Sequence, residues 1–165
     1  MTQQSHPFER GPYLTAALLC ERVLDERDGV KSLIRVVDRV TVNVVGPMPA
    51  EGPPPMLHNL TLFIAFKSGH ARGPMNLIVR IDKPSTEPGP EPLRATVNFE
   101  GEDDRGVNVI IPMGINANVA GLWWFHVELE PTDGGDAVAV THVPLRVIYL
   151  QQATQGPATP GPGPQ

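Results

Sequence analysis

Residues 122–150 read LWWFHVELE, then PTDGGD, then AVAVTHVPLRVIYL, and this stretch decides the fold. Every second residue of its first segment is apolar, namely Trp123, Phe125, Val127 and Leu129. A period of two is typical of a β-strand that buries one face. The segment 131–135 supplies the proline, aspartate and glycines of a tight turn, so the stretch predicts a β-hairpin.

Working outward, strand-like patterns occur along most of the chain. The segments that are alternating or rich in apolar and β-branched residues are 14–25, 31–45, 60–66, 77–81, 93–99 and 107–111. Turn-forming or proline-rich stretches separate them, at 26–29, 46–56, 69–73, 84–92 and 101–106. We expect 14–25 and 31–45 to pair as a first hairpin. We expect 60–66 and 77–81 to pair as a second.

The segment from Leu14 to Leu24 also fits a helix, because Leu14 and Leu18 fall on one helical face. A strand is preferred there, since the β-branched run 31–45 needs a partner beside the turn at 26–29. About eight strands with no convincing helix between them predict an all-β fold. We expect an antiparallel two-sheet sandwich of the immunoglobulin-like or C2-like kind.

The sandwich is expected to occupy residues 14–150 as one domain, a length that can bury a sizeable core. Residues 1–13 are polar with two prolines and indicate an irregular lead-in. Residues 151–165 contain four prolines and three glycines with hardly an apolar side chain. Such a segment cannot offset the entropy of ordering, so we expect a disordered tail.

Composition argues against several classes of function. A formal charge of −5 and 13 scattered Lys and Arg residues offer no basic surface to DNA or RNA. The apolar stretch from Leu14 to Cys20 is too short to span a membrane. Cys20 is the single cysteine and cannot form an internal disulfide, so no oxidising compartment is indicated.

Catalytic motifs are missing from the sequence. It holds no glycine-flanked serine elbow, no phosphate-binding glycine loop with lysine and no His-Glu-x-x-His zinc motif, so we expect no enzyme and no cofactor. Cys20 with a histidine such as His58 is a conceivable nucleophile. A buried strand cysteine that packs as a small apolar residue is the preferred interpretation.

Two pairs of segments carry a resemblance to a known family. The first is Leu18-Leu19-Cys20-Glu21-Arg22 with Asp38-Arg39, and the second is Trp123-Trp124-Phe125 with Pro144-Leu145-Arg146-Val147. Together they resemble a family of short bacterial proteins of unknown function with such an opening and such a closing hairpin. The resemblance implies a cytoplasmic β-sandwich and no particular activity.

The last hairpin carries a candidate metal site. If Trp123 faces the core, His126 lies opposite His142, with Glu128 on the same outward face. Two imidazoles and a carboxylate are ligands that zinc or iron accepts. The preferred interpretation is a solvated polar face without a metal, because no metal-spacing motif accompanies these residues. For the acidic residues 100–105, a plain surface turn is likewise the preferred interpretation, and a calcium-binding loop is the alternative.

Candidate docking residues come from both ends of the chain. Trp124 has the opposite parity to Trp123 and should point outward, with Arg146 at outward parity on the paired strand. Arg22, Asp38 and Arg39 are expected on adjoining strands of the first hairpin. They form either an ordinary surface charge ladder or the polar rim of a docking surface, where arginine and aromatic residues are favoured.

These patterns favour a non-catalytic protein-interaction or assembly module whose partner is another protein or a second copy of the chain. A sandwich that binds a small ligand or a carbohydrate on an aromatic platform at Trp124 is the alternative. A metal-dependent function at the last hairpin ranks third.

Overall fold

Residues 10–47, 49 and 56–152 are described in a computed structural model of the chain. In this part of the chain there are nine strands and no helix, hence no helix able to cross a membrane. In chain order the strands are β1 (Tyr13–Asp25), β2 (Lys31–Val36), β3 (Arg39–Val45), β4 (Leu57–Lys67), β5 (Arg72–Asp82), β6 (Leu93–Glu100), β7 (Gly106–Asn116), β8 (Gly121–Pro131) and β9 (Val138–Gln152).

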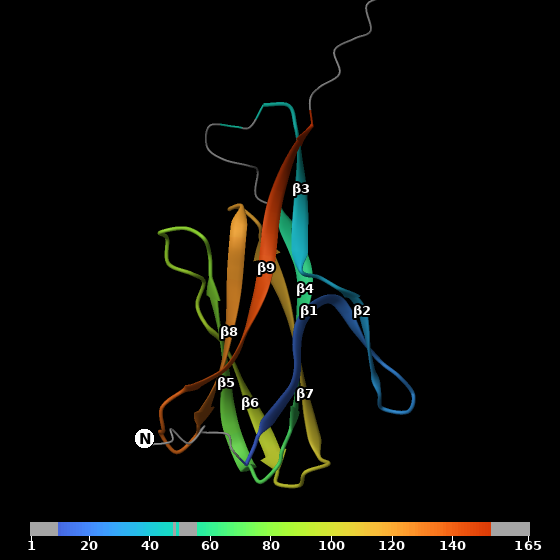
Figure 1. The fold of residues 1–165 in the computed structure, drawn as a ribbon, viewed down its shortest axis with the longest axis vertical. Coiled ribbons are helices and arrows are strands. Elements are labelled where there is room, and N and C mark those ends of the chain that lie inside the picture. Colours follow the sequence, from blue (N-terminus) through green and yellow to red (C-terminus); the bar gives the residue numbers. More distant parts are fainter. Residues whose placement is uncertain (1–9, 48, 50–55, 153–165) are drawn as a thin grey trace, which may run out of the picture.

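The strands form two sheets packed face to face. The four-stranded sheet has the order β2-β1-β4-β7, and all its neighbours are antiparallel. The five-stranded sheet has the order β3-β9-β8-β5-β6, in which β3 and β9 are parallel and the other neighbours antiparallel. Figure 1 shows β3 and β9 running side by side, and the β1–β2 hairpin projecting from the sandwich. The predicted all-β sandwich is confirmed, with one parallel pair that was not expected.

Apolar side chains of both sheets fill the space between them, as the alternation predicts. Trp123, Phe125, Val127 and Leu129 of β8 are all buried. Leu60, Leu62, Ile64 and Phe66 of β4 bury the facing side of the other sheet. Phe66 meets Phe99 of β6 edge to face across the core, with ring centroids 5.8 Å apart. Such burial is the main stabilising term of a sandwich this size.

The predicted strand 31–45 is wrong as a single element, because the chain turns within it. Arg35 has a φ of 49°, in the left-handed region that non-glycine residues rarely adopt. Val37 then donates its backbone N–H to the carbonyl of Leu19 at 2.8 Å, still beside the first sheet. The next strand, β3, continues in the other sheet. The described part of the chain therefore has nine strands where about eight were expected.

The break in this strand also moves two of the candidate docking residues. Asp38 accepts a hydrogen bond from the backbone N–H of Arg146 at 2.9 Å, and Arg39 begins β3, parallel to β9. The expectation that Asp38 and Arg39 lie on the first hairpin is therefore wrong. They lie at an edge of the five-stranded sheet, while Arg22 stays on β1.

The predicted second hairpin, between β4 and β5, is also wrong, because these strands belong to different sheets. The connection between them is held by other segments. Ser68 donates its backbone N–H to the carbonyl of Arg105 at 2.9 Å. Gly69 has a φ of 55°, and a Cβ at this position would lie 2.6 Å from the carbonyl oxygen of Arg10. These contacts carry the chain across the sandwich.

The last strand runs beyond the expected domain end at residue 150. Gly46 donates its N–H to the carbonyl of Gln152 at 3.2 Å, and its own carbonyl accepts a hydrogen bond from Gln151 Nε2 at 3.0 Å. Of the expected lead-in over 1–13, residues 1–9 lie outside the described residues, and Tyr13 already belongs to β1. Of the expected disordered tail over 151–165, Gln151 and Gln152 belong to β9, and residues 153–165 lie outside the described residues.

Candidate functional site

The two tryptophans point to opposite faces of β8. Trp123 is 2% exposed, and its indole N–H donates a hydrogen bond to the carbonyl of Val119 at 3.0 Å. Trp124 is 37% exposed on the outer face of the five-stranded sheet. The parity predicted for the last hairpin is therefore confirmed.

Trp124 stands among exposed residues of β9 and β3. It lies directly opposite Pro144 and diagonally from Arg146, which pairs with Leu122. Diagonal neighbours on one sheet face are about 7–8 Å apart, within reach of long side chains. Arg146 in turn lies beside Arg39 of β3. We call Trp124, Pro144, Arg146 and Arg39 the Trp124 surface; all four are exposed.

Arg39 is oriented by the residue before it. Its Nε and Nη2 donate hydrogen bonds to the two carboxylate oxygens of Asp38, at 3.1 and 3.2 Å. These hydrogen bonds lower the pKa of Asp38 and raise the pKa of Arg39. Both side chains are well exposed, so the pair contributes little to stability. Its effect is to fix the direction of a guanidinium at the sheet edge.

His126 and His142 meet on the outer face, as predicted. They are directly opposite in register, and their Nδ1 atoms are 2.7 Å apart. The other ring nitrogen of His126, Nε2, lies 2.9 Å from Oδ2 of Asp82 in β5. A neutral His126 that donates its Nε2–H to Asp82 accepts the Nδ1–H of His142. The three side chains form a row across three strands.

Glu128, the third residue of the candidate metal site, has a different partner. Its carboxylate pairs with Arg80 of β5. A β-bulge between Val127 and Glu128 shifts the register at this point. Among the residues that the structure describes, no three His, Cys, Asp or Glu side chains are grouped to hold a metal ion. The histidine pair therefore has Asp82 beside it and not Glu128.

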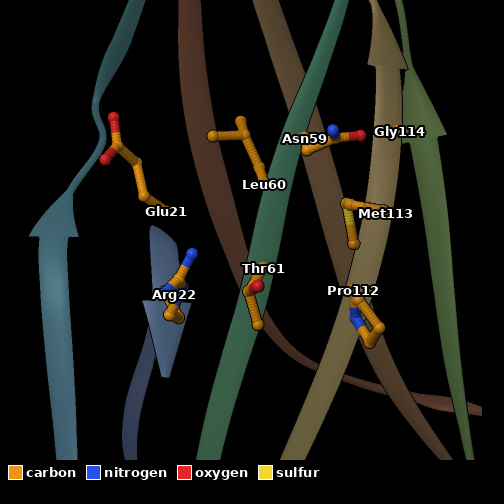
Figure 2. A pocket seen from close by; sticks show the side chains of 8 residues that line it. All are labelled: Glu21, Arg22, Asn59, Leu60, Thr61, Pro112, Met113 and Gly114. Carbon is orange, nitrogen blue, oxygen red and sulfur yellow. The ribbon is translucent and has the colours of Figure 1, made fainter. Parts of the chain in front are cut away.

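A cleft opens where β1 and β4 separate. The two strands pair as far as Cys20 and Thr61, and beyond this point β1 pairs with β2 alone. Figure 2 shows Glu21 and Arg22 of β1 across the gap from Asn59 of β4. The separation leaves a cavity of about 460 Å³.

The cleft continues toward β3 as a second cavity of about 610 Å³. Both cavities are lined by Glu21, Arg22, Asn59 and Leu60, so they adjoin and are treated together as one cleft with two ends. The end toward β3 is also lined by Arg35, Val37, Arg39, Val40, Thr41 and His58. We call the whole the Arg22 cleft. It brings Arg22 and Arg39 together, although they belong to different sheets.

The Arg22 cleft carries excess positive charge. Its lining holds three arginines and one carboxylate, that of Glu21. Glu21 pairs with Arg35 at 2.9 Å, and Arg39 is bound by Asp38. Arg22 makes no ion pair and no side-chain hydrogen bond with any described residue. Among the described residues, one guanidinium of the cleft therefore has no partner.

His58 adds an unsatisfied group to the same lining. Its Nε2 is buried, and no described residue hydrogen-bonds to it. Buried polar atoms without a partner are uncommon in folded proteins. Such an atom in a cleft lining is a position where a ligand group can supply a missing hydrogen bond.

Cys20 lies in the sheet as a small apolar residue. It is fully buried, and its thiol donates a weak hydrogen bond to the carbonyl of Thr61, with the sulfur 3.6 Å away. Burial raises the pKa of Cys20, so it is a neutral thiol at neutral pH.

The acidic turn 100–105 is contacted by basic side chains of the same chain. Arg105 lies 3.3 Å from Glu102 and 3.6 Å from Glu100. Lys67 donates a hydrogen bond to the carbonyl of Asp104 at 2.7 Å. These contacts are those of a surface turn and not of a preformed calcium loop.

Comparison with known proteins identifies no family for this chain. No protein-family model matches the chain. No curated protein matches it either. Among solved structures, the N-terminal domain of PorA aligns over 81% of this chain and 97% of that chain, with 13% sequence identity and a TM-score of 0.26. A similarity this low carries no argument, and the resemblance to a bacterial family stays a prediction.

Three residues, Asp82, Arg35 and His58, were not assigned to these sites from the sequence. Asp82 is outward on β5, but its place beside His126 requires the order of strands in the sheet. Arg35 and His58 reach the Arg22 cleft because β1 leaves β4, which no local pattern announces. The arginines within residues 22–39 were the sequence feature that could have indicated a positively charged site in this part of the chain.

Proposed function

We propose that this chain is a non-catalytic protein-interaction module that binds another protein through the Trp124 surface. The observation that carries the proposal is the exposure of Trp124, at 37%, beside Arg146 on the paired strand. Tryptophan and arginine are the residues that most often concentrate binding energy in protein interfaces. Arg39, oriented by Asp38, extends this surface to the sheet edge.

The position of Trp124 favours a protein partner over a small ligand. Trp124 lines neither the Arg22 cleft nor the cavity of about 150 Å³ beside Trp123. Small-ligand sites are concave, whereas protein interfaces use broad faces with an aromatic anchor. A carbohydrate or small-ligand platform at Trp124 therefore ranks second.

The state of the reactive side chains supports a non-catalytic role. Cys20 is a buried thiol, and both ring nitrogens of His126 are engaged by neighbours. A single cysteine in this state also fits the cytoplasmic location that the family resemblance implies, and we include that location in the proposal.

Capture and reconstitution test the proposal. Proteins retained from native lysate are identified by mass spectrometry, and the purified partner is then titrated against the chain. The double variant Trp124→Ala, Arg146→Ala should lose binding while keeping the far-ultraviolet circular dichroism spectrum. The double variant Arg94→Ala, Thr96→Ala, on β6 of the same sheet, is the matched control and should bind normally. Undiminished binding by the first variant would exclude the Trp124 surface.

A further inference from the structure

The strand β3 is an open edge of the five-stranded sheet. In its ladder with β9, Arg146 donates its N–H to the carbonyl of Asp38, and Gly46 donates to the carbonyl of Gln152. Residues of a parallel pair direct their backbone groups alternately to one neighbour and the other. The even-numbered residues therefore face β9, and the odd-numbered residues of β3 face outward. No described strand pairs with them.

This edge lacks the usual protection against strand addition. Exposed edges are commonly guarded by proline, charged residues or short length. The sequence of β3 is RVTVNVV, with one charge at its first residue and no proline. The other edge strands carry more of this protection, since β7 contains Pro112, and β2 and β6 each contain two charged residues, Lys31 with Arg35 and Arg94 with Glu100.

The Arg22 cleft adjoins the open edge. Arg39, Val40 and Thr41 of β3 line it, and Arg22 and His58 line it from β1 and β4. A segment that adds to a sheet edge gains main-chain hydrogen bonds, and pockets beside the edge receive its alternate side chains. An open edge next to a cleft has the geometry of such a site.

The charge of the cleft selects the side chain that fits. Arg22 has no partner among the residues that the structure describes, and the cleft is positive although the chain as a whole has a formal charge of −5. A carboxylate bound to a guanidinium makes the strong, two-point hydrogen bonds that Arg39 already makes with Asp38. An acidic side chain would supply the missing partner of Arg22.

We propose that the open edge of β3 binds an extended acidic segment of a partner protein, which adds as a sixth strand and places a carboxylate in the Arg22 cleft. The odd-numbered residues of β3 hold its backbone, and Arg22 selects its charge. The site shares Arg39 with the Trp124 surface, but Trp124 and Arg146 do not line the Arg22 cleft, and the proposal does not rest on the function proposed for them.

A defined peptide tests this site. The probe is a fluorescein-labelled nonapeptide in which valine and glutamate alternate, and the control peptide has lysine in place of glutamate. The acidic peptide should bind and the basic one should not, and added salt should weaken binding. Amide resonances of β3 should shift on titration, and hydrogen exchange of its odd-numbered residues should slow.

Two variants change the proposed site in different ways, so the test does not fail if one of them is misfolded. Thr41→Pro removes an N–H from the open edge and leaves the ladder with β9 intact. Arg22→Glu reverses the unpaired charge. Each should weaken binding of the acidic peptide about tenfold or more. Arg27→Glu, in the exposed β1–β2 turn, makes the same charge change and should bind as the wild type does, as should the variant Trp124→Ala.

Three results would overturn the proposal. The first is no binding of the acidic peptide up to roughly 1 mM. The second is equal binding of both peptides, or unchanged binding by Arg22→Glu. The third is a dimer of the free chain in sedimentation that Thr41→Pro dissociates, which would assign the edge to a second copy.

Discussion

Replacing Trp123 with alanine removes an indole that is 2% exposed, together with its hydrogen bond to the carbonyl of Val119. Truncating a buried tryptophan costs about 3–5 kcal/mol, and the unpaired carbonyl adds about 1 kcal/mol. The total of about 4–6 kcal/mol approaches the whole stability of many domains. Trp124→Ala should cost about 1 kcal/mol or less, because that side chain is 37% exposed.

Urea unfolding followed by far-ultraviolet circular dichroism measures both costs. Fluorescence is unsuitable, because Trp123 and Trp124 are the two tryptophans of the chain. Trp123→Phe keeps much of the apolar volume, so its unfolding free energy should lie between those of the wild type and Trp123→Ala. This variant provides a measurement if Trp123→Ala does not fold. A larger loss for Trp124→Ala than for Trp123→Ala would mean that β8 faces the other way, and the outward pairing of His126 with His142 would fail with it.

Three further predictions follow from the chain end, the histidine row and the cysteine. A chain ending at Gln152 should keep its melting temperature, whereas one ending at Leu150 should melt several degrees lower, because Gly46 loses two hydrogen bonds. Dialysis against EDTA should change neither melting temperature nor native mass, and near-stoichiometric zinc, iron or calcium in the purified protein would refute this. The raised pKa of Cys20 makes the folded state keep a proton that the unfolded chain releases, so the unfolding free energy should fall as the pH rises above about 8.5. In Cys20→Ala this fall should be smaller, as measured by denaturant titration at several pH values. An unchanged slope of unfolding free energy against pH would contradict this.

The faces of the strands were predictable, because side-chain alternation is a local property. Trp123, Trp124, His126 and His142 all lie where one hairpin register puts them. That register rests on a tight turn and a buried apolar row, both visible in residues 122–150.

The assignment of strands to sheets was not predictable in the same way. A strand pattern states which face is buried and not which neighbour it has, so β4 and β5 were wrongly paired. The turn between β2 and β3, which follows a positive φ at the non-glycine residue Arg35, has no sequence signal. Since the Arg22 cleft depends on that turn and on the separation of β1 from β4, it could not be foreseen.

The most direct test of the docking role is site-specific photo-crosslinking in cells. The photoreactive residue p-benzoylphenylalanine replaces Trp124 in one variant and Thr96, on the exposed face of β6, in the other. Position 124 should give a discrete cross-linked partner that position 96 does not give. A cross-link of equal yield at both positions, or none at 124, would contradict docking through the Trp124 surface.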